Sequence, residues 1–216
     1  MPRRPRLWVP GGIYHITVRG NNRQAIFCGE ADFQRYLAAL HHIRGELPHR
    51  VLAYALMPNH VHLVLQADEN VALSDVMHRL STDYTRYFNK RYHRVGQLYQ
   101  GRFYSNFVNR DAYLLEVTRY VHLNPVRAHL SQQPADYPWS SFRGYVGLDS
   151  DPSGFIEPSR VLEFFGTLPR ERTQRYRQFV EEFAMAKQDD WVRRLSRKKL
   201  IPPLHWLAPQ KVPGTF

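Results

Sequence analysis

The 216 residues include 30 lysines and arginines against 19 aspartates and glutamates, which gives a formal net charge of +11. This excess favours a polyanionic partner, and nucleic acid is a commoner partner than a membrane surface for such a balance. The single cysteine excludes an intrachain disulfide and a thiolate zinc site, and no apolar run is long enough to cross a bilayer. We therefore expect a soluble, cytoplasmic protein with no membrane contact.

Hydrophobic periodicity along the chain predicts four strands and two long helices in the order βαββαβ. In chain order these are a strand over 13–19, a helix over 30–47, strands over 51–57 and 61–65, a helix over 72–92 and a strand over 103–109. This order is that of the ferredoxin-like split βαβ motif. The predicted fold class is therefore α+β, a ferredoxin-like antiparallel sheet with these helices on one face, plus a tyrosine-bearing helix and a helical C-terminal tail.

A further helix is predicted over 110–123, and Pro125 is expected to end or kink it. Residues 149–158 are rich in Asp, Ser, Pro and Gly, which is typical of a linker. We expect a catalytic domain over 1–148, a linker over 149–158 and a basic, helical C-terminal extension over 159–216. The extension would add phosphate contacts that do not depend on DNA sequence.

His60 and His62 lie two residues apart in a predicted strand, so both side chains project from one face while Val61 faces the core. Two neutral imidazoles on one face can bind a single divalent ion. A His-x-His pattern is weak evidence by itself in a chain with 11 histidines. One ring could equally cap the preceding turn while the other is partly exposed, and the pattern leaves both interpretations open.

Tyr120 and Asn124 are four residues apart, which places a phenol and an amide on one face of the predicted helix. A phenol has a pKa near 10, so a nearby cation would be needed to favour the phenolate and to withdraw charge from a phosphate under attack. The product, a tyrosine phosphodiester, permits rejoining of DNA without ATP. The alternative is that Tyr120 is a core residue and Asn124 a cap.

Four short segments have unusual combinations of residues. One follows the first predicted strand, one leads into the strand with His60 and His62, one enters the last predicted strand, and one lies on the helix after it. They are residues 19–23 (RGNNR), 57–62 (MPNHVH), 100–103 (QGRF) and 120–128 (YVHLNPVRA). Together they resemble the HUH single-tyrosine transposases, specifically the REP-associated tyrosine transposases, over about residues 8–148. The resemblance implies a ferredoxin-like fold, a divalent metal (Mg²⁺ or Mn²⁺), and cleavage of single-stranded DNA beside short palindromic hairpins.

Carried onto this sequence, the resemblance makes Tyr120 the nucleophile, which would form a 5′-phosphotyrosine. It makes His60 and His62 metal ligands, with Asn124 as the third ligand. Tyr113 is a rival nucleophile, because it lies seven residues earlier on approximately the same helical face. The Arg-Tyr-Val-x-x-Asn-Pro context favours Tyr120 over Tyr113.

DNA contacts are expected from polar side chains beside the presumed site, where arginine can bind phosphate or stack on a splayed base. These residues are Arg19, Asn21, Arg23, Gln100, Arg102 and Arg127. For three of them, Arg19, Arg23 and Arg102, a solvated loop charge fits the sequence equally well.

Three nearby features are interpreted as structural. His15 could stand beside the metal site, but packing as a half-buried histidine is favoured. Aromatic residues within 84–88 alternate with basic ones, yet their helical spacing predicts a core face. His122, two residues after Tyr120, is predicted to point away from the site.

The sequence thus predicts an HUH tyrosine transposase, a metal-dependent enzyme that nicks single-stranded DNA and transfers the strand, acting as a monomer or homodimer. One alternative is a protein of the same fold that binds hairpins without cutting them. Another is a metallohydrolase that activates water on the histidine pair.

Overall fold

The computed structural model describes residues 8–148 and 155–185. Its centre is a four-stranded sheet in the spatial order β2-β3-β1-β4, with every neighbouring pair antiparallel. The strands are β1 (Ile13–Arg19), β2 (His49–Met57), β3 (His60–Ala67) and β4 (Tyr104–Val108). This is the ferredoxin-like order, so the predicted fold class is confirmed.

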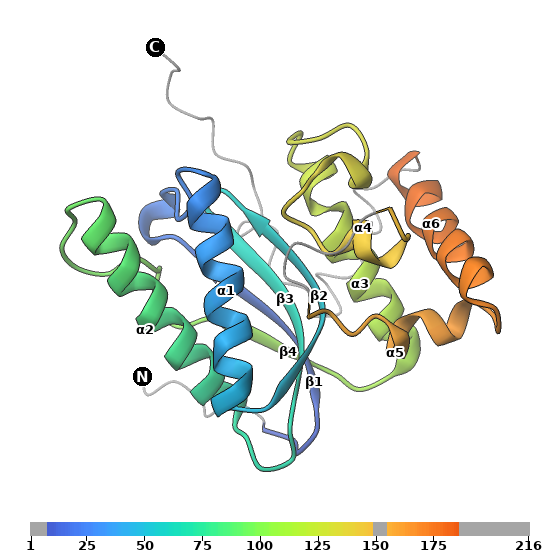
Figure 1. The fold of residues 1–216 in the computed structure, drawn as a ribbon, viewed down its shortest axis with the longest axis horizontal. Coiled ribbons are helices and arrows are strands. Elements are labelled where there is room, and N and C mark those ends of the chain that lie inside the picture. The colour runs from blue at the N-terminus through green and yellow to red at the C-terminus, as the bar shows by residue number, and fades with distance from the viewer. Residues whose placement is uncertain (1–7, 149–154, 186–216) are drawn as a thin grey trace.

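Helices cover both faces of the sheet (Figure 1). On one face lie α1 (Glu30–Glu46) and α2 (Leu73–Arg91), which follow β1 and β3 along the chain. On the other face lie α3 (Asp111–Arg127), which carries Tyr120, then α4 (Phe142–Tyr145) and α6 (Pro169–Met185). The short α5 (Ser159–Leu162) connects this group to the sheet edge, and none of the described helices has the length and apolar character to span a bilayer.

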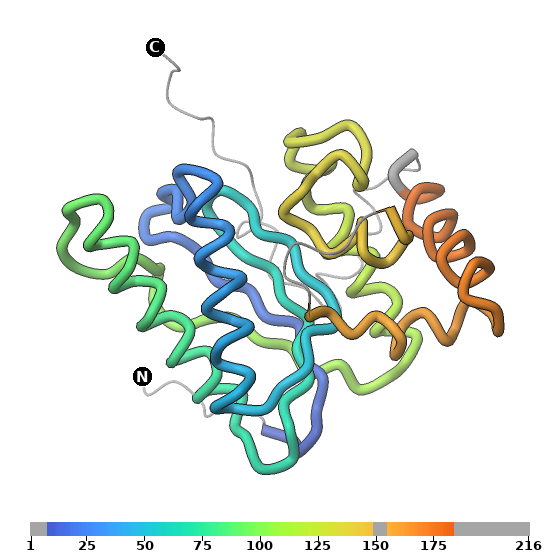
Figure 2. Tube along the Cα trace, viewed as in Figure 1, coloured from blue at the N-terminus to red at the C-terminus, as the bar shows by residue number. Residues whose placement is uncertain are grey.

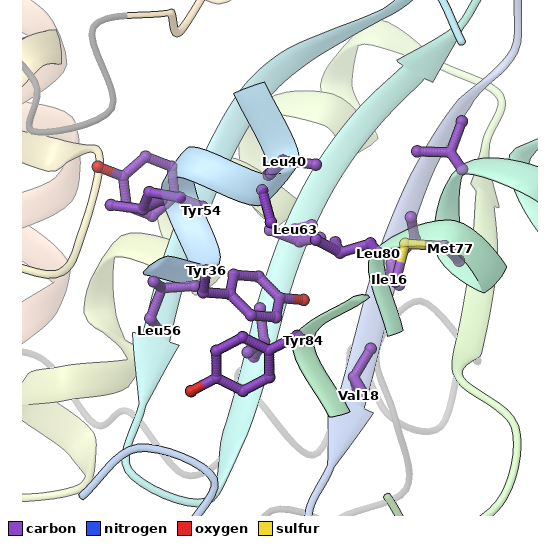
Figure 3. Packing of buried hydrophobic residues seen from close by; sticks show 14 of the residues in the cluster. Ile16, Val18, Tyr36, Leu40, Tyr54, Leu56, Leu63, Met77, Leu80 and Tyr84 are labelled. Carbon is purple, nitrogen blue, oxygen red and sulfur yellow. The ribbon is translucent and has the colours of Figure 1, made fainter. Parts of the chain in front are cut away.

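The main hydrophobic core fills the space between the sheet and the α1–α2 layer. Side chains that alternate along the strands, such as Ile16 and Leu63, meet Leu40 of α1 and Leu80 of α2, and all four are fully buried (Figure 3). Burying each such side chain contributes about 2 kcal/mol. Because strand neighbours point to opposite faces, the residues between these core positions face α3.

Tyrosines of α1 and α2 also belong to this core. Tyr36 and Tyr84 have almost no exposed surface, and the Tyr84 hydroxyl donates to the Ile26 carbonyl at 2.6 Å. The prediction that the aromatic face of α2 is structural is therefore confirmed.

Helix α3 is longer than the sequence predicts. It continues through Pro125 to Arg127, so the expected end at residue 123 is wrong. The proline lacks one donor, but Asn124 and Pro125 still accept backbone bonds from Ala128 and Leu130. Pro125 is itself buried, so packing of α3 against its neighbours outweighs the local rule.

Part of the expected linker packs against the sheet. Ile156 forms an isolated parallel bridge with Val51, and Glu157 N donates to the Val51 carbonyl at 2.9 Å. Figure 2 shows the chain after residue 155 passing beside β2. Residues 149–154 lie outside the described residues, as does the part of the extension over 186–216. The division into catalytic domain, linker and extension stays a prediction.

Candidate active site

The sheet face that α3 covers is polar toward one end. His15 and Thr17 of β1 and His62 of β3 are all buried there, and the strand register sets Thr17 opposite His62 and Arg19 opposite His60. Each of these residues alternates with a core residue on its strand, such as Ile16 between His15 and Thr17. The sheet therefore separates an apolar face from a face with polar chemistry.

Three imidazoles meet on this face. The rings of His60 and His62 have centroids 5.0 Å apart, so the two converge as the strand spacing predicts. His15 stacks on His62 with centroids 5.4 Å apart, and its Nε2 lies 3.1 Å from His62 Nδ1. Thr17 Oγ1 is 3.3 Å from the same Nδ1. The expectation that His15 packs as an ordinary half-buried residue is wrong, because it is fully buried and hydrogen-bonded to His62.

Both members of the histidine pair are neutral at neutral pH. Burial, and then the charge of Arg19, lower the pKa of His60 to about 3. Burial also holds the pKa of His62 well below its usual value, with further contributions from His60, His15 and Arg127. Neutral imidazole is the form that binds metal.

The free nitrogens of the pair fit a cation. His60 Nδ1 lies 2.6 Å from Asn59 Oδ1, which can only accept, so Nδ1 carries the hydrogen and Nε2 keeps its lone pair. His62 Nε2 is buried and has no hydrogen-bond partner among the described residues. A buried polar atom left in this way is costly unless something binds it.

A third ligand would have to be of another type. Within residues 8–148 and 155–185, no group of three or more histidine, cysteine, aspartate or glutamate side chains is arranged to hold a metal. Asn124 is buried, and its Nδ2 donates to the Tyr120 carbonyl one turn earlier at 2.7 Å. That bond uses the amide nitrogen and leaves Oδ1 to accept or to coordinate.

Tyr120 lies directly over the histidines. Its ring centroid is 5.4 Å from that of His62 and 5.7 Å from that of His15, and both contacts are edge-on. The phenol from α3 and the imidazoles from the sheet therefore meet, as the predicted chemistry requires. By contrast, the rival Tyr113 hydrogen-bonds through its side chain with Asn106 of β4.

The environment of the Tyr120 hydroxyl combines opposing effects. The side chain has no exposed surface, and this burial raises the pKa of the phenol. The positive charge of Arg127 and the polar side chain of Asn124 act to lower the pKa, but burial has the larger effect. The Arg127 guanidinium lies 5.8 Å from the centre of the Tyr120 ring.

Loops near the His60 end of the sheet bring several of the predicted DNA-binding residues together. Asn21 N donates to the Leu98 carbonyl and Gln100 N to the Arg19 carbonyl, both at 2.8 Å, so the loops after β1 and before β4 are joined. A Cβ on Gly20 would lie 2.1 Å from the Gln24 carbonyl, so this tight turn requires glycine.

The predicted arginines differ in exposure. Arg19 is only 5% exposed, and its buried Nε has no hydrogen-bond partner among the described residues. Arg23 is partly exposed, and its carbonyl accepts from Asn59 beside the histidine pair. Arg102 is exposed and lines a cavity of about 420 Å³ against α2, away from the histidine face.

Comparison with known proteins identifies the family. A family model described as IS200-like transposase matches residues 9–124, which is more than half of the chain. The chain belongs to the IS200-like transposase family. Members of this family are DNA-cleaving enzymes, so the expected enzyme class is confirmed.

Proteins similar to this transposase agree in name, and a solved one has the same fold. A REP-associated tyrosine transposase of Haemophilus influenzae is 25% identical over 159 residues, 68% of this chain and 89% of the relative. One of Escherichia coli K12 is 22% identical over 167 residues, 73% of this chain and 96% of the relative. A solved REP-associated tyrosine transposase bound to a REP hairpin has a TM-score of 0.58 at 21% identity, covers 73% of this chain and 92% of its own, and shows the same fold.

Proposed function

We propose that this transposase cuts one DNA strand beside a palindromic hairpin by direct attack of Tyr120 on a phosphodiester. The observation that carries the proposal is the edge-on contact of the Tyr120 ring with His62 and His15, which brings a phenol to two buried imidazoles. The hairpin substrate is supported by the relative that binds a REP hairpin. A single strand can bend into such a site more easily than a duplex.

The proposed reaction is a transesterification. The Tyr120 hydroxyl loses its proton to solvent, its oxygen forms a bond to phosphorus, and the bond from phosphorus to the 3′ oxygen breaks. The 5′ phosphate stays on the tyrosine, and the leaving 3′ oxygen takes up a proton to become a hydroxyl. The energy of the broken bond is kept in the phosphotyrosine, so a 3′ hydroxyl can attack it and rejoin the strand.

We assign a divalent ion, Mg²⁺ or Mn²⁺, to His60, His62 and Asn124. When bound, such an ion would favour the phenolate and withdraw charge from the phosphate. The chain's own contribution is to aim the ligand atoms. Asn59 holds His60 through Nδ1, which leaves His60 Nε2 available. His15 Nε2 and Thr17 Oγ1 lie at hydrogen-bonding distance from His62 Nδ1, where either can accept its hydrogen and so leave His62 Nε2 available.

The DNA strand is assigned to the loops at the His60 end of the sheet. Arg19, beside His60 and nearly buried, suits a phosphate close to the cleaved bond. Asn21, Arg23, Gln100 and Arg102 would contact the strand further out. Arg127, near the Tyr120 ring, would stabilise the developing phenolate. Because Tyr120 is fully buried, entry of the strand must uncover its hydroxyl.

The test is a covalent trapping assay. Labelled hairpin oligonucleotides with single-stranded flanks of randomised sequence are incubated with the full chain and Mn²⁺, then separated on a denaturing gel. We expect a DNA–protein adduct that Tyr120→Phe abolishes and Tyr113→Phe retains. Cleavage without an adduct that survives Tyr120→Phe would indicate a water-activating metallohydrolase instead, and binding without any cleavage would indicate a hairpin-binding protein.

A further inference from the structure

A buried chain of hydrogen bonds links β2, α3 and α6 on the side of α3 away from the histidines. Ser141 Oγ lies 2.9 Å from Tyr54 N and 2.7 Å from His122 Nε2. On the other side of the ring, His122 Nδ1 lies 2.7 Å from the Tyr176 hydroxyl. We call the side chains of Ser141, His122 and Tyr176 the polar bridge, and none of the three has exposed surface.

Every donor in the polar bridge can be satisfied at once. Burial lowers the pKa of His122 to about 3, so the ring is neutral and has one N–H. Tyr176 O–H can donate to Nδ1, Nε2–H to Ser141 Oγ, and Ser141 O–H to the Tyr54 carbonyl at 3.2 Å. A complete buried network favours one arrangement, because any shift leaves a buried polar atom without a partner.

The apolar contacts beneath α3 do not fix its rotation in the same way. The sheet presents small or branched side chains to α3, including Ala53, Ala55 and Val64, which pack without directional bonds. A tyrosine hydroxyl lies about 9 Å from its helix axis, so a rotation of about 10° moves it by about 1.5 Å. A displacement of that size is enough to slow a reaction that depends on alignment.

Helix α6 also holds α3 through the residue next to the nucleophile. The Arg119 guanidinium lies 4.2 Å from the ring centre of Phe179 and 3.7 Å from that of Phe183, and it forms an ion pair with Glu116. Only 5% of Arg119 is exposed. Helix α6 thus contacts α3 at Arg119, before Tyr120 in the sequence, and at His122, after it.

We propose that the polar bridge and α6 fix the rotation of α3 and so hold the Tyr120 hydroxyl over the histidine pair. Tyr176 is then a positioning residue for a reaction that it does not touch. The family match ends at residue 124, so Ser141 and Tyr176, which both lie after it, would contribute to catalysis through the position of α3. The first of the two tests below rests on the proposed function, and the second does not.

The first test compares two tyrosines that each lose one hydroxyl. Tyr176→Phe breaks the polar bridge. Tyr145→Phe is the matched control, because Tyr145 is equally buried and its hydroxyl donates to the Leu52 carbonyl at 2.6 Å without bonding to α3. With saturating hairpin oligonucleotide and Mn²⁺, we expect Tyr176→Phe to form the adduct about tenfold more slowly at an unchanged Kd for DNA. Tyr145→Phe should keep the wild-type rate.

The second test needs no catalysis. Hydrogen exchange of the full chain, read by mass spectrometry, should speed up in α3 relative to α1 in Tyr176→Phe and not in Tyr145→Phe. Ser141→Ala should act in the same direction as Tyr176→Phe. Equal rates and equal exchange in the two tyrosine variants would overturn the inference, as would unchanged α3 exchange in Tyr176→Phe. If wild-type protein forms no adduct, the proposed function fails while the exchange result still decides the role of the polar bridge.

Discussion

Removing the His15 ring should weaken Mn²⁺ binding although His15 is not an assigned ligand. His15 Nε2 lies 3.1 Å from His62 Nδ1 and sets the direction of the opposite nitrogen, Nε2. Loss of a partner of this kind costs about 10–100-fold in metal affinity. Thr17 Oγ1, at 3.3 Å from the same Nδ1, remains in His15→Leu. We therefore expect the lower end, about tenfold or about 1.4 kcal/mol, in the single variant.

The double variant should show a larger effect. With both His15→Leu and Thr17→Val, His62 Nδ1 keeps neither neighbour, and the loss should approach 100-fold. The assay is isothermal titration calorimetry of the full chain with MnCl₂, with circular dichroism to check folding. His41→Leu is the control, because this exposed histidine of α1 stacks on Phe155 on the other face of the sheet.

One result would refute this reasoning directly. If His62→Leu abolishes Mn²⁺ binding while the double variant binds as tightly as the wild type, the orientation of His62 does not depend on its partners on β1. Wild-type protein that binds no Mn²⁺ would contradict the metal assignment itself.

Three further outcomes are expected. Because burial raises the pKa of Tyr120, the rate of adduct formation in Mg²⁺ should rise about tenfold per pH unit from about pH 6 to 8, and a flat profile would argue against an attacking phenolate. The free energy of unfolding in urea should fall as the pH drops below about 6.5, by up to about 1.4 kcal/mol per pH unit for His122. The reason is that the unfolded chain binds a proton there, while the folded ring, with a pKa of about 3, does not; equal stability at pH 7.5 and 5.5 would contradict this. Asp32→Ala should cost about 3 kcal/mol in the same assay, since the buried carboxylate accepts hydrogen bonds from Tyr92, Tyr87 and the Cys28 N–H; a loss below about 1 kcal/mol would contradict it.

The order and the approximate bounds of the strands and long helices could be predicted because their signals are local. Residues 13–19 alternate with period two, and β1 has those bounds in the structure. The end of α3 could not be predicted in this way. Pro125 is a local signal for termination, but the buried surface of α3, including Val121 and Leu123, holds the helix together beyond it.

The candidate site was predictable only in part. The convergence of His60 and His62 follows from strand geometry within one segment. The contact of His15 with His62 depends on the register that sets Thr17 opposite His62. The register between two distant strands cannot be predicted from the sequence of either strand alone. The polar bridge was missed for the same reason, because its hydrogen bonds join residues that are 19 and 54 positions apart.

The two faces of the sheet explain how this protein can hold costly polar groups beside Tyr120, the proposed nucleophile. Core residues such as Leu63 face α1 and α2, while their strand neighbour His62 faces α3. The buried Nε2 of His62 costs about 1–3 kcal/mol while nothing binds it, and a core on the opposite face of the same strand can offset that amount. A bound cation would remove the cost.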